Sequence, residues 1–132
     1  MQHKNLQTFF QEVAKENAEN TALHSANSIY TYRQLDSKAN EFAGWIQSRA
    51  LVLGDVVGII STKCFEDYAL MIACLKLGIT YTNIDIDNPT VRTRDICDTC
   101  TPKLLFCSQE VSAVSKNTGV TVALYKGHRL RV

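Results

Sequence analysis

The sequence predicts an α/β fold in which a mainly parallel sheet with flanking helices follows N-terminal helices and a small hairpin. After residue 53, short apolar runs alternate with segments of helix length, a pattern typical of strand–helix–strand units. Those runs are almost unbroken, as in strands that are buried on both faces. Before residue 54, apolar residues instead recur at helical spacing in two segments. We therefore expect helices and a hairpin over residues 1–53 and βαβ units over residues 54–125.

The N-terminal part begins with a predicted helix over residues 6–16, and a hairpin follows it. The stretch TALHSANSIYTY, residues 21–32, predicts two short strands around a polar tip at Ser25–Ser28. A second helix is expected over residues 32–49, with Thr31 as its N-cap. The apolar residues at helical spacing are Leu6, Phe9, Phe10 and Val13 in the first helix and Leu35, Ala39, Phe42, Ala43 and Ile46 in the second.

The C-terminal part is predicted to contain four strands joined by three helices. Gly78 is expected to cap the first of these helices, and Pro89 to lie in the first turn of the next. Because strands and helices alternate, the crossovers should be right-handed and the sheet mainly parallel. The predicted strands are 56–60, 80–84, 103–107 and 120–124, and the predicted helices are 65–77, 90–99 and 109–117. In the helix over 65–77, the residues expected to face inward are Tyr68, Met71, Ile72 and Leu75.

Length and composition fit a single soluble domain of 132 residues, 45% apolar and 20% charged. A net charge of +1 gives no field that would attract nucleic acid or an anionic membrane, so neither partner is expected. No apolar run approaches the ~20 residues of a membrane span, and the polar N-terminus lacks a signal peptide's apolar core. A cytoplasmic location is therefore expected. The basic residues near the C-terminus are interpreted as a solvated charged end. They are Lys126, His128, Arg129 and Arg131.

Cysteine usage points to free thiols. An odd count of five, without a secretion signal, favours the reduced state. Cys97 and Cys100 form the only C-x-x-C, but a structural zinc site needs four ligands, and nearby in sequence only Cys107 could add one. A thioredoxin-like pair would open a helix, whereas this pair falls near the end of one. We expect all five thiols to be free and to bind no metal.

The acidic residues after the second predicted strand allow two interpretations. Asp85, Asp87 and Asn88 lie where ligands collect in parallel sheets, beyond the carboxyl end of a strand. The same residue types also satisfy free backbone groups at an ordinary strand-to-helix turn, and their position alone favours that second interpretation. Other acid pairs look structural as well, since Glu66 and Asp67 open a helix where negative charge is favourable. The pair Asp95 and Asp98 is assigned to a solvated helix face.

Catalytic motifs are missing from these 132 residues. The patterns G-x-x-x-x-G-K-[ST], G-x-G-x-x-G and G-x-S-x-G do not occur, so the backbone cradles for phosphate and the nucleophile elbow are absent. None of the histidines, His3, His24 and His128, is spaced against a carboxylate or a cysteine as a ligand set would be. The sequence therefore predicts no catalytic, cofactor-binding or metal-binding residue in this chain.

The order of short motifs nevertheless resembles the N-terminal portion of adenylate-forming enzymes, most closely the adenylation domains of nonribosomal peptide synthetases. TYRQLDSKANEFAGWI resembles the family's TYxEL helix, LVLGDVVGII resembles its GVxxGDxV strand entry, and LKLGITYTNIDIDNPTVR is similar to LKAGxAYVPIDPxYPxxR. The resemblance covers residues 6–124. The matching residues are Thr31, Tyr32, Leu35, Asn40, Ala43, Gly54, Asp55, Val57, Leu75, Lys76, Gly78, Tyr81, Ile84, Asp85, Pro89 and Arg92.

Two positions depart from the family pattern. Asn83 stands where the family usually has proline, and Ala50 where it usually has glycine. Both positions concern local backbone geometry. In the family, the acidic stretch after the second strand is a structural turn, so the resemblance also favours that interpretation of Asp85 and Asp87.

The resemblance implies a two-step reaction for a parent enzyme. With ATP and magnesium, a carboxylic acid, expected to be an amino acid, forms an acyl-adenylate and releases pyrophosphate. The acyl group then passes to the phosphopantetheine thiol of a carrier protein. The family's phosphate loop, nucleotide contacts, amino-acid pocket and catalytic lysine all come later in sequence, so none of those residues is carried over to this chain.

Two classes of function follow. In the first, the chain is the N-terminal piece of an adenylation domain, as a shortened form, a split-gene product or a remnant, and is inactive alone. Its partners would be the remainder of the domain or synthetase and a carrier protein. In the second, it is a non-enzymatic α/β module that binds protein, or one half of a split adenylation domain. A downstream reading frame that opens with a TSGTTG-like loop would favour the split enzyme.

Overall fold

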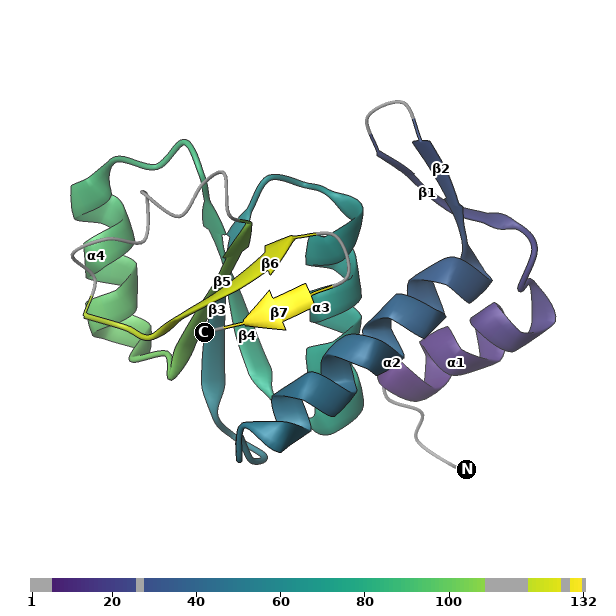
Figure 1. Cartoon of the computed structure of the whole chain (residues 1–132), viewed down its shortest axis with the longest axis horizontal. Helices are drawn as coiled ribbons and strands as arrows, with labels where there is room; N and C mark the ends of the chain where they lie inside the picture. Colours follow the sequence, from purple (N-terminus) through teal and green to yellow (C-terminus); the bar gives the residue numbers. More distant parts are fainter. Residues whose placement is uncertain (1–5, 26–27, 109–118, 127–128, 132) are drawn as a thin grey trace. The chain divides into compact units, whose positions relative to one another are not determined.

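The computed structural model describes residues 6–25, 28–108, 119–126 and 129–131 (Figure 1). The chain divides into two compact units that interleave along the sequence. The helical unit comprises Met1–Ala50 and Lys63–Gly78, and the sheet unit comprises Leu51–Thr62 and Ile79–Val132. Each unit is described by itself.

In the part of the helical unit that the structure describes, there are three helices and a two-stranded antiparallel hairpin (Figure 1). Helix α2 packs along α3, and α1 contacts both of them. The N-terminal helix and the hairpin fall where the sequence predicted them. The bounds are α1 Leu6–Glu16, β1 Thr21–Ser25, β2 Ser28–Thr31, α2 Tyr32–Ser48 and α3 Phe65–Leu77.

Helix α2 starts at a capping box, which confirms the predicted N-cap. The hydroxyl of Thr31 accepts a hydrogen bond from the Gln34 amide at 3.2 Å, and the Gln34 side chain accepts one from the Thr31 amide at 2.8 Å. Together the two bonds satisfy backbone donors that the first turn of a helix leaves unpaired. All five residues of the predicted apolar face are buried, namely Leu35, Ala39, Phe42, Ala43 and Ile46.

The predicted inward face of α3 is wrong. Tyr68, Met71, Ile72 and Leu75 are only partly buried. The helix is apolar on nearly every side, so periodicity cannot single out one face. The buried face instead carries small side chains such as Ala69 and Ala73, which allow close helix packing. Its fully or largely buried residues are Phe65, Asp67, Ala69, Leu70, Ala73 and Cys74.

Among its described residues, the sheet unit contains a five-stranded sheet in the order β4-β3-β5-β6-β7 (Figure 1). Strands β3, β4, β5 and β6 pair in parallel, as predicted, and β7 is antiparallel to β6. Helix α4 ends at Cys100, which confirms the predicted position of the C-x-x-C pair at a helix end. The bounds are β3 Val56–Ser61, β4 Thr80–Asp85, α4 Thr90–Cys100, β5 Leu104–Ser108, β6 Val122–Lys126 and β7 Arg129–Arg131.

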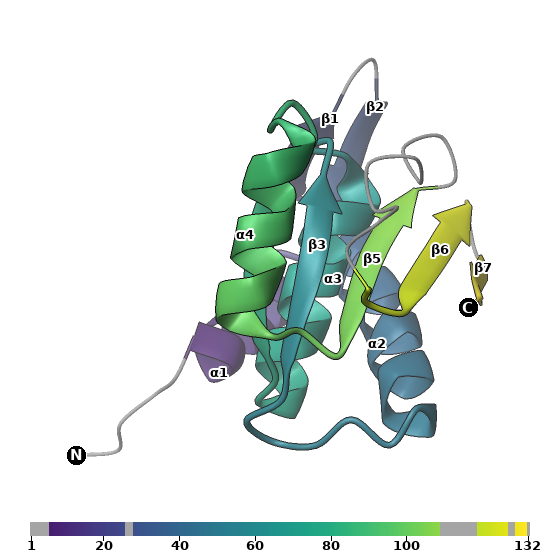
Figure 2. The same cartoon turned by 90° about the vertical axis from the view of Figure 1, so that its left-hand side faces the viewer.

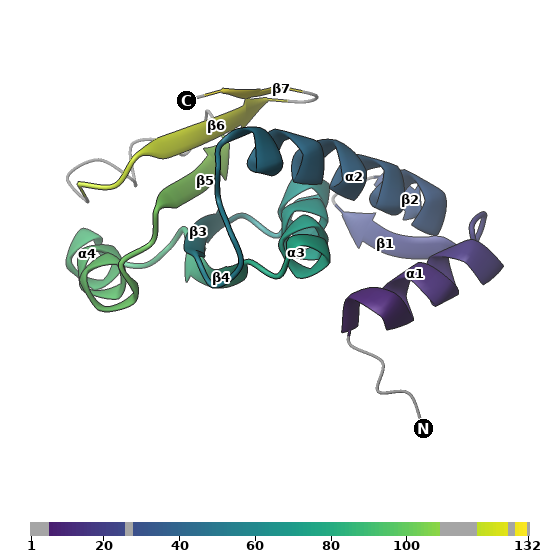
Figure 3. The same ribbon diagram turned by 90° about the horizontal axis from the view of Figure 1, so that it is seen from below.

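Helix α4 lies along one face of this sheet (Figures 2 and 3), and a buried cluster joins the two. In that face, Gly58 of β3 has no room for a side chain, because an added Cβ would stand 2.5 Å from a methyl carbon of the buried Leu105. The Leu105 and Ile84 side chains fill the space over Gly58, which explains a glycine inside an apolar strand. The cluster, called here the α4 core, consists of Ile60, Ile84, Cys97, Leu105 and Cys107.

The C-terminal strands differ in part from the prediction. Strand β6 begins at Val122, two residues later than expected, and the basic end of the chain contributes a strand, β7, that was not predicted. β7 covers the free edge of β6 by antiparallel pairing between Leu124 and Arg131 and their neighbours. The helix predicted over 109–117 lies outside the described residues.

A loop with positive φ angles connects α2 to β3. Ala50, where the family pattern has glycine, adopts a φ of 60°, and Gly54 adopts a φ of 91°. The Asp55 carboxylate closes the loop by accepting a hydrogen bond from the Val52 amide at 2.9 Å, and it pairs with Lys103 at 3.2 Å. The Val52 bond, helped by Lys103, holds the pKa of Asp55 below its ordinary value against a smaller opposing effect of burial.

Candidate functional site

The carboxyl edge of the parallel sheet is where ligands gather in folds of this class. Asp85 ends β4 at this edge and is exposed. Its carboxylate accepts a hydrogen bond from the Asp87 amide at 2.8 Å, and its carbonyl accepts one from the Asn88 amide at 3.1 Å. These bonds belong to a tight turn that leads into α4. The acidic stretch is therefore built as the strand-to-helix turn that the sequence favoured.

The other acid pairs also have structural positions. Asp67 is fully buried in the first turn of α3, and its carboxylate accepts a hydrogen bond from the Cys64 amide at 3.3 Å. Negative charge is favourable at a helix N-terminus. Asp95 and Asp98 lie exposed on α4, as predicted.

Lys76 is the lysine of the family-like motif, and it links two helices of the helical unit. Its ammonium group lies 2.6 Å from the Asp36 carboxylate and 2.6 Å from the Asn40 side-chain oxygen. The Lys76 side chain is only 8% exposed. Both partners of the buried ammonium group lie on α2, so Lys76 links α3 to α2.

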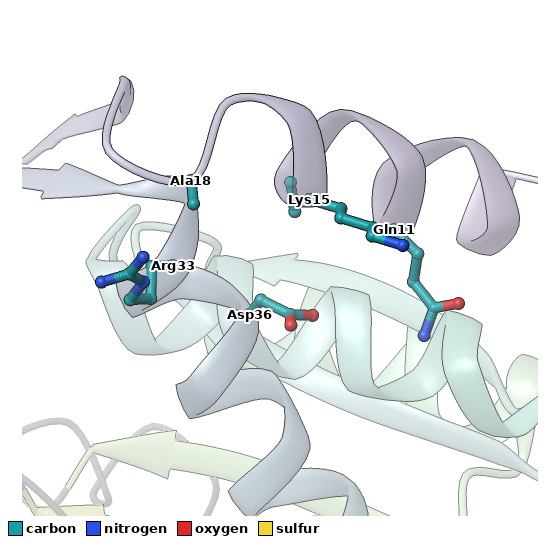
Figure 4. Close-up of a pocket in the computed structure, with 6 residues that line it drawn as sticks. Gln11, Lys15, Ala18, Arg33 and Asp36 are labelled. Carbon is teal, nitrogen blue, oxygen red and sulfur yellow. The ribbon is translucent and has the colours of Figure 1, made fainter.

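A shallow hollow between α1 and α2 is shown in Figure 4. Asp36 lies between Arg33 on one side and Gln11 and Lys15 on the other (Figure 4). Both central charges already have partners, since Arg33 pairs with Glu19 at 2.6 Å and Asp36 pairs with Lys76. The two charged residues of α2 in the hollow are thus already committed to ion pairs. It is lined by Gln11, Ala14, Lys15, Ala18, Arg33 and Asp36.

All five cysteines are free thiols in the structure. Burial raises the pKa of the Cys74 thiol to about 12, so this thiol is unreactive at neutral pH. Within the described ranges, no three or more His, Cys, Asp or Glu side chains gather as a metal site would require. The predicted absence of bound metal stays a prediction.

No helix within the part of the chain that the structure describes combines the length and apolar character that a membrane crossing needs.

The strand order of the sheet unit defines an open, mainly parallel α/β sheet, in which β3 lies between β4 and β5 and the chain order reverses at β3. The family can then be named, because the sequence model of the AMP-binding enzyme family matches residues 10–130, and the chain belongs to that family. The expected resemblance to an N-terminal portion of adenylate-forming enzymes is confirmed.

Comparison with individual proteins agrees with the family. The chain is 27% identical to tyrocidine synthase 3 of Brevibacillus parabrevis over 94% of its own length, but it spans only 2% of that protein. The N-terminal subdomain of Klebsiella oxytoca NpsA has a TM-score of 0.83 at 23% identity, covering 94% of this chain and 32% of that one. An artificially fused adenylation–PCP di-domain, NpsA-ThdA, gives 0.84 at 23% identity, with coverage of 94% and 23%. The structural likeness shows the shared fold.

Proposed function

We propose that this chain is the N-terminal part of an amino-acid-activating adenylation domain. The observation that carries the proposal is the position of the stretch from Leu75 to Arg92. Its glycine, Gly78, adopts a φ of 70° as the left-handed cap of α3, its residues 80–85 form β4, and Asp85 makes the turn into α4. Each part of the family-like motif thus has a physical role where it stands. The match with a peptide synthetase along nearly the whole chain supports the same proposal.

In the proposed parent enzyme, ATP and magnesium would supply the adenylyl group and the charge that stabilises its transfer. We infer that the residues described here do not form a site for that nucleotide. The sequence has no glycine-rich loop to offer converging amide donors, and Lys76 is committed to Asp36. This chain would therefore contribute framework, and the chemistry would rest on residues that it does not contain.

The chain alone is proposed to be inactive in adenylate formation. Two exposed arginines on α4, Arg92 and Arg94, could give weak affinity for nucleotide phosphates. Adenylyl transfer requires positioned donors and cations, so affinity without positioning should give little turnover.

A second candidate is a protein-binding α/β module, and one observation favours it. Strand β7 is a three-residue strand with arginine at both ends, and it covers the edge of β6. Short, charged edge strands protect a sheet against unwanted pairing. A module that works without the rest of an adenylation domain would need such protection.

Joining the chain to its natural downstream continuation distinguishes the two candidates. The joined protein should catalyse pyrophosphate exchange that depends on ATP and on one amino acid, and it should load that amino acid onto a phosphopantetheine-bearing carrier protein. A carrier partner is proposed by analogy with the adenylation–PCP di-domain, which shares the fold of this chain. A joined, folded protein with no exchange for any amino or aryl acid would contradict the proposed function and favour the binding module.

A further inference from the structure

Two cysteines at the end of α4 stand one helical turn apart. Cys97 and Cys100 are three residues apart, and Cys100 is the last residue of the helix. The regular geometry of an α-helix places Cα atoms at this spacing about 5 Å apart. Disulfides bridge Cα atoms separated by roughly 4.4–6.8 Å. The backbone separation of this pair is therefore already suitable for a disulfide.

The side chains must approach each other before a bond can form, and the helix end allows this. In a regular helix, Cβ atoms at this spacing lie about 5–6 Å apart, whereas a disulfide needs about 3.8 Å. The next residue, Thr101, leaves the helix with a φ of 46°, and its amide donates to the Cys97 carbonyl at 2.9 Å. This bond closes the terminal turn of α4, and a shift of 1–2 Å, roughly the difference between those distances, concerns only that turn.

The two thiols differ in their access to solvent. Cys97 is 3% exposed and belongs to the α4 core, whereas Cys100 is partly exposed. A small oxidant in solution therefore meets Cys100 first. Cys97 is the nearest internal thiol along the helix, and it is positioned to complete the reaction. Cys107 shares the α4 core with Cys97 but is fully buried on β5, which makes it a poor first target.

We propose that Cys97 and Cys100 form a redox-responsive pair that a low-molecular-weight disulfide, such as oxidised glutathione, converts to an intrahelical disulfide. The Cys100 thiolate attacks the glutathione disulfide, forming a mixed disulfide and releasing one glutathione thiolate. The Cys97 thiolate then attacks the Cys100 sulfur and releases the second glutathione. The two cysteine protons pass to the two released thiolates, so two protein thiols are oxidised and one glutathione disulfide is reduced.

The surroundings of the pair make the reaction slow at neutral pH and the product persistent. Burial, followed by the Asp98 carboxylate and Cys100, raises the pKa of Cys97. A helix C-terminus also disfavours negative charge on either sulfur. Thiolates are therefore scarce, and attack is slow. In an oxidoreductase with a C-x-x-C at a helix N-terminus, the helix stabilises a thiolate and so favours the reduced form. The Cys97–Cys100 pair lacks that stabilisation, so its disulfide should be harder to reduce.

The consequence for the protein is local to the sheet unit. Closing the bridge fixes the last turn of α4, just before the connection to β5, and draws Cys97 toward the helix end and away from its neighbours in the α4 core. The pair would thus connect the redox state of the solution to the packing between α4 and the sheet.

The proposal is tested by equilibrating the chain with excess oxidised glutathione at about pH 8.5, where a larger share of the thiols ionises. Remaining thiols are then alkylated, and the protein is mapped by peptide mass spectrometry. The expected result is a Cys97–Cys100 peptide that is lighter by two hydrogens. Cys100→Ser should abolish it, whereas Cys64→Ser, which removes a partly exposed thiol of the helical unit, should leave its yield unchanged.

Two results would overturn the proposal. One is a wild-type protein, shown to be folded by circular dichroism, that carries only a glutathione adduct on Cys100. The other is a Cys97–Cys107 bridge that forms equally well in the Cys100→Ser variant. A bridge that forms only in urea would count against the proposal too, because it would show that the folded helix end does not permit the approach.

Discussion

Ala50 carries a local conformational cost that glycine would remove. Its φ of 60° lies in the left-handed region, which L-residues other than glycine occupy at about 1–2 kcal/mol. The residue is exposed, so a missing methyl group loses little packing. Part of the gain is offset by the larger unfolded-state entropy of glycine. This conformation explains why glycine suits the position, and it identifies Ala50 as a strained substitute.

We expect Ala50→Gly to stabilise the chain by about 0.5–1 kcal/mol, as measured by urea unfolding. The matched control is Gly54→Ala in the same loop. Gly54 has a φ of 91° and open space where a methyl group would be added, so alanine there should destabilise through conformation alone. If Ala50→Gly lowered the unfolding midpoint while Gly54→Ala left it unchanged, the assigned loop geometry would be wrong.

Asp55 makes stability depend on pH in a defined direction. Its pKa is lower in the folded chain than in the unfolded chain, so the folded state favours the carboxylate. The resulting stabilisation is present above the unfolded pKa and is lost as pH falls through the folded pKa. Thermal unfolding from about pH 5 downward should therefore show a shallower loss of stability in Asp55→Asn than in the parent chain.

Two groups lower the pKa of Asp55 by different amounts, and this difference provides a second variant for the same experiment. The Val52 amide contributes more to the lowered pKa of Asp55 than Lys103 does. Lys103→Met should therefore keep most of the steep acid-dependent fall that Asp55→Asn loses. Parallel pH profiles for all three proteins would contradict the assigned role of the loop carboxylate.

At the scale of elements, the edge strand β4 shows why asparagine and proline can exchange at one position. The Thr80 amide donates to the Asp55 carbonyl at 2.9 Å and the Ile86 amide donates to the Ser61 carbonyl at 3.3 Å. Because amides of a strand alternate in direction, even-numbered residues of β4 donate toward β3 and odd-numbered ones face away. The amide of Asn83 is therefore outside the β3–β4 ladder, and a proline at that position removes no ladder bond.

Neighbouring proline substitutions test this register. Asn83→Pro should retain the β3–β4 ladder, whereas Thr82→Pro removes a ladder donor and should be less stable by about 1–3 kcal/mol than Asn83→Pro. Chemical denaturation of both variants gives the comparison. Equal losses, or a larger loss for Asn83→Pro, would place β4 in a different register against β3.

The buried residues of a helix could be predicted from the sequence where its apolar residues lie on a single face. Helix α2 has a single apolar face, so its buried residues and its Thr31 cap followed directly. Helix α3 is apolar on most sides, and its buried face depends on which side its small residues meet α2, which no local pattern encodes. Strand β7 was missed because three residues are too few for an alternating pattern to indicate a strand. The Gly127-His128 pair between two short runs was the available hairpin signal.

The acidic turn shows what sequence could establish about a site. Its place in the sequence, directly after a predicted strand, put Asp85 at the sheet edge where ligands gather. Its role as a turn residue follows from the hydrogen bond that its carboxylate accepts from the Asp87 amide, and that bond can be seen only in the structure. The pairing of Lys76 with Asp36 across 40 positions was equally hidden from any local pattern. The C-x-x-C pair could be placed at a helix end in advance, whereas the difference in burial between Cys97 and Cys100 could not.

At the scale of the whole molecule, the chain has the fold of its family, and its 132 residues lack the motifs G-x-x-x-x-G-K-[ST], G-x-G-x-x-G and G-x-S-x-G. The AMP-binding family model matches residues 10–130, and the fold agrees with solved relatives at TM-scores above 0.8. Residues of the family-like motif have structural roles: Gly78 caps α3, Asp85 makes a turn and Lys76 links α3 to α2. The central claim is the proposal that this chain supplies framework for adenylate formation and does not itself carry out the reaction.

Labelled pyrophosphate exchange on the chain alone tests that claim most directly. The purified chain, shown to be folded by circular dichroism, is incubated with ATP, magnesium, labelled pyrophosphate and each amino acid in turn. Because positioned donors for the phosphate groups are missing from its sequence, we predict no label in ATP above a heat-killed control. Exchange clearly above that control and dependent on one amino acid would contradict the account.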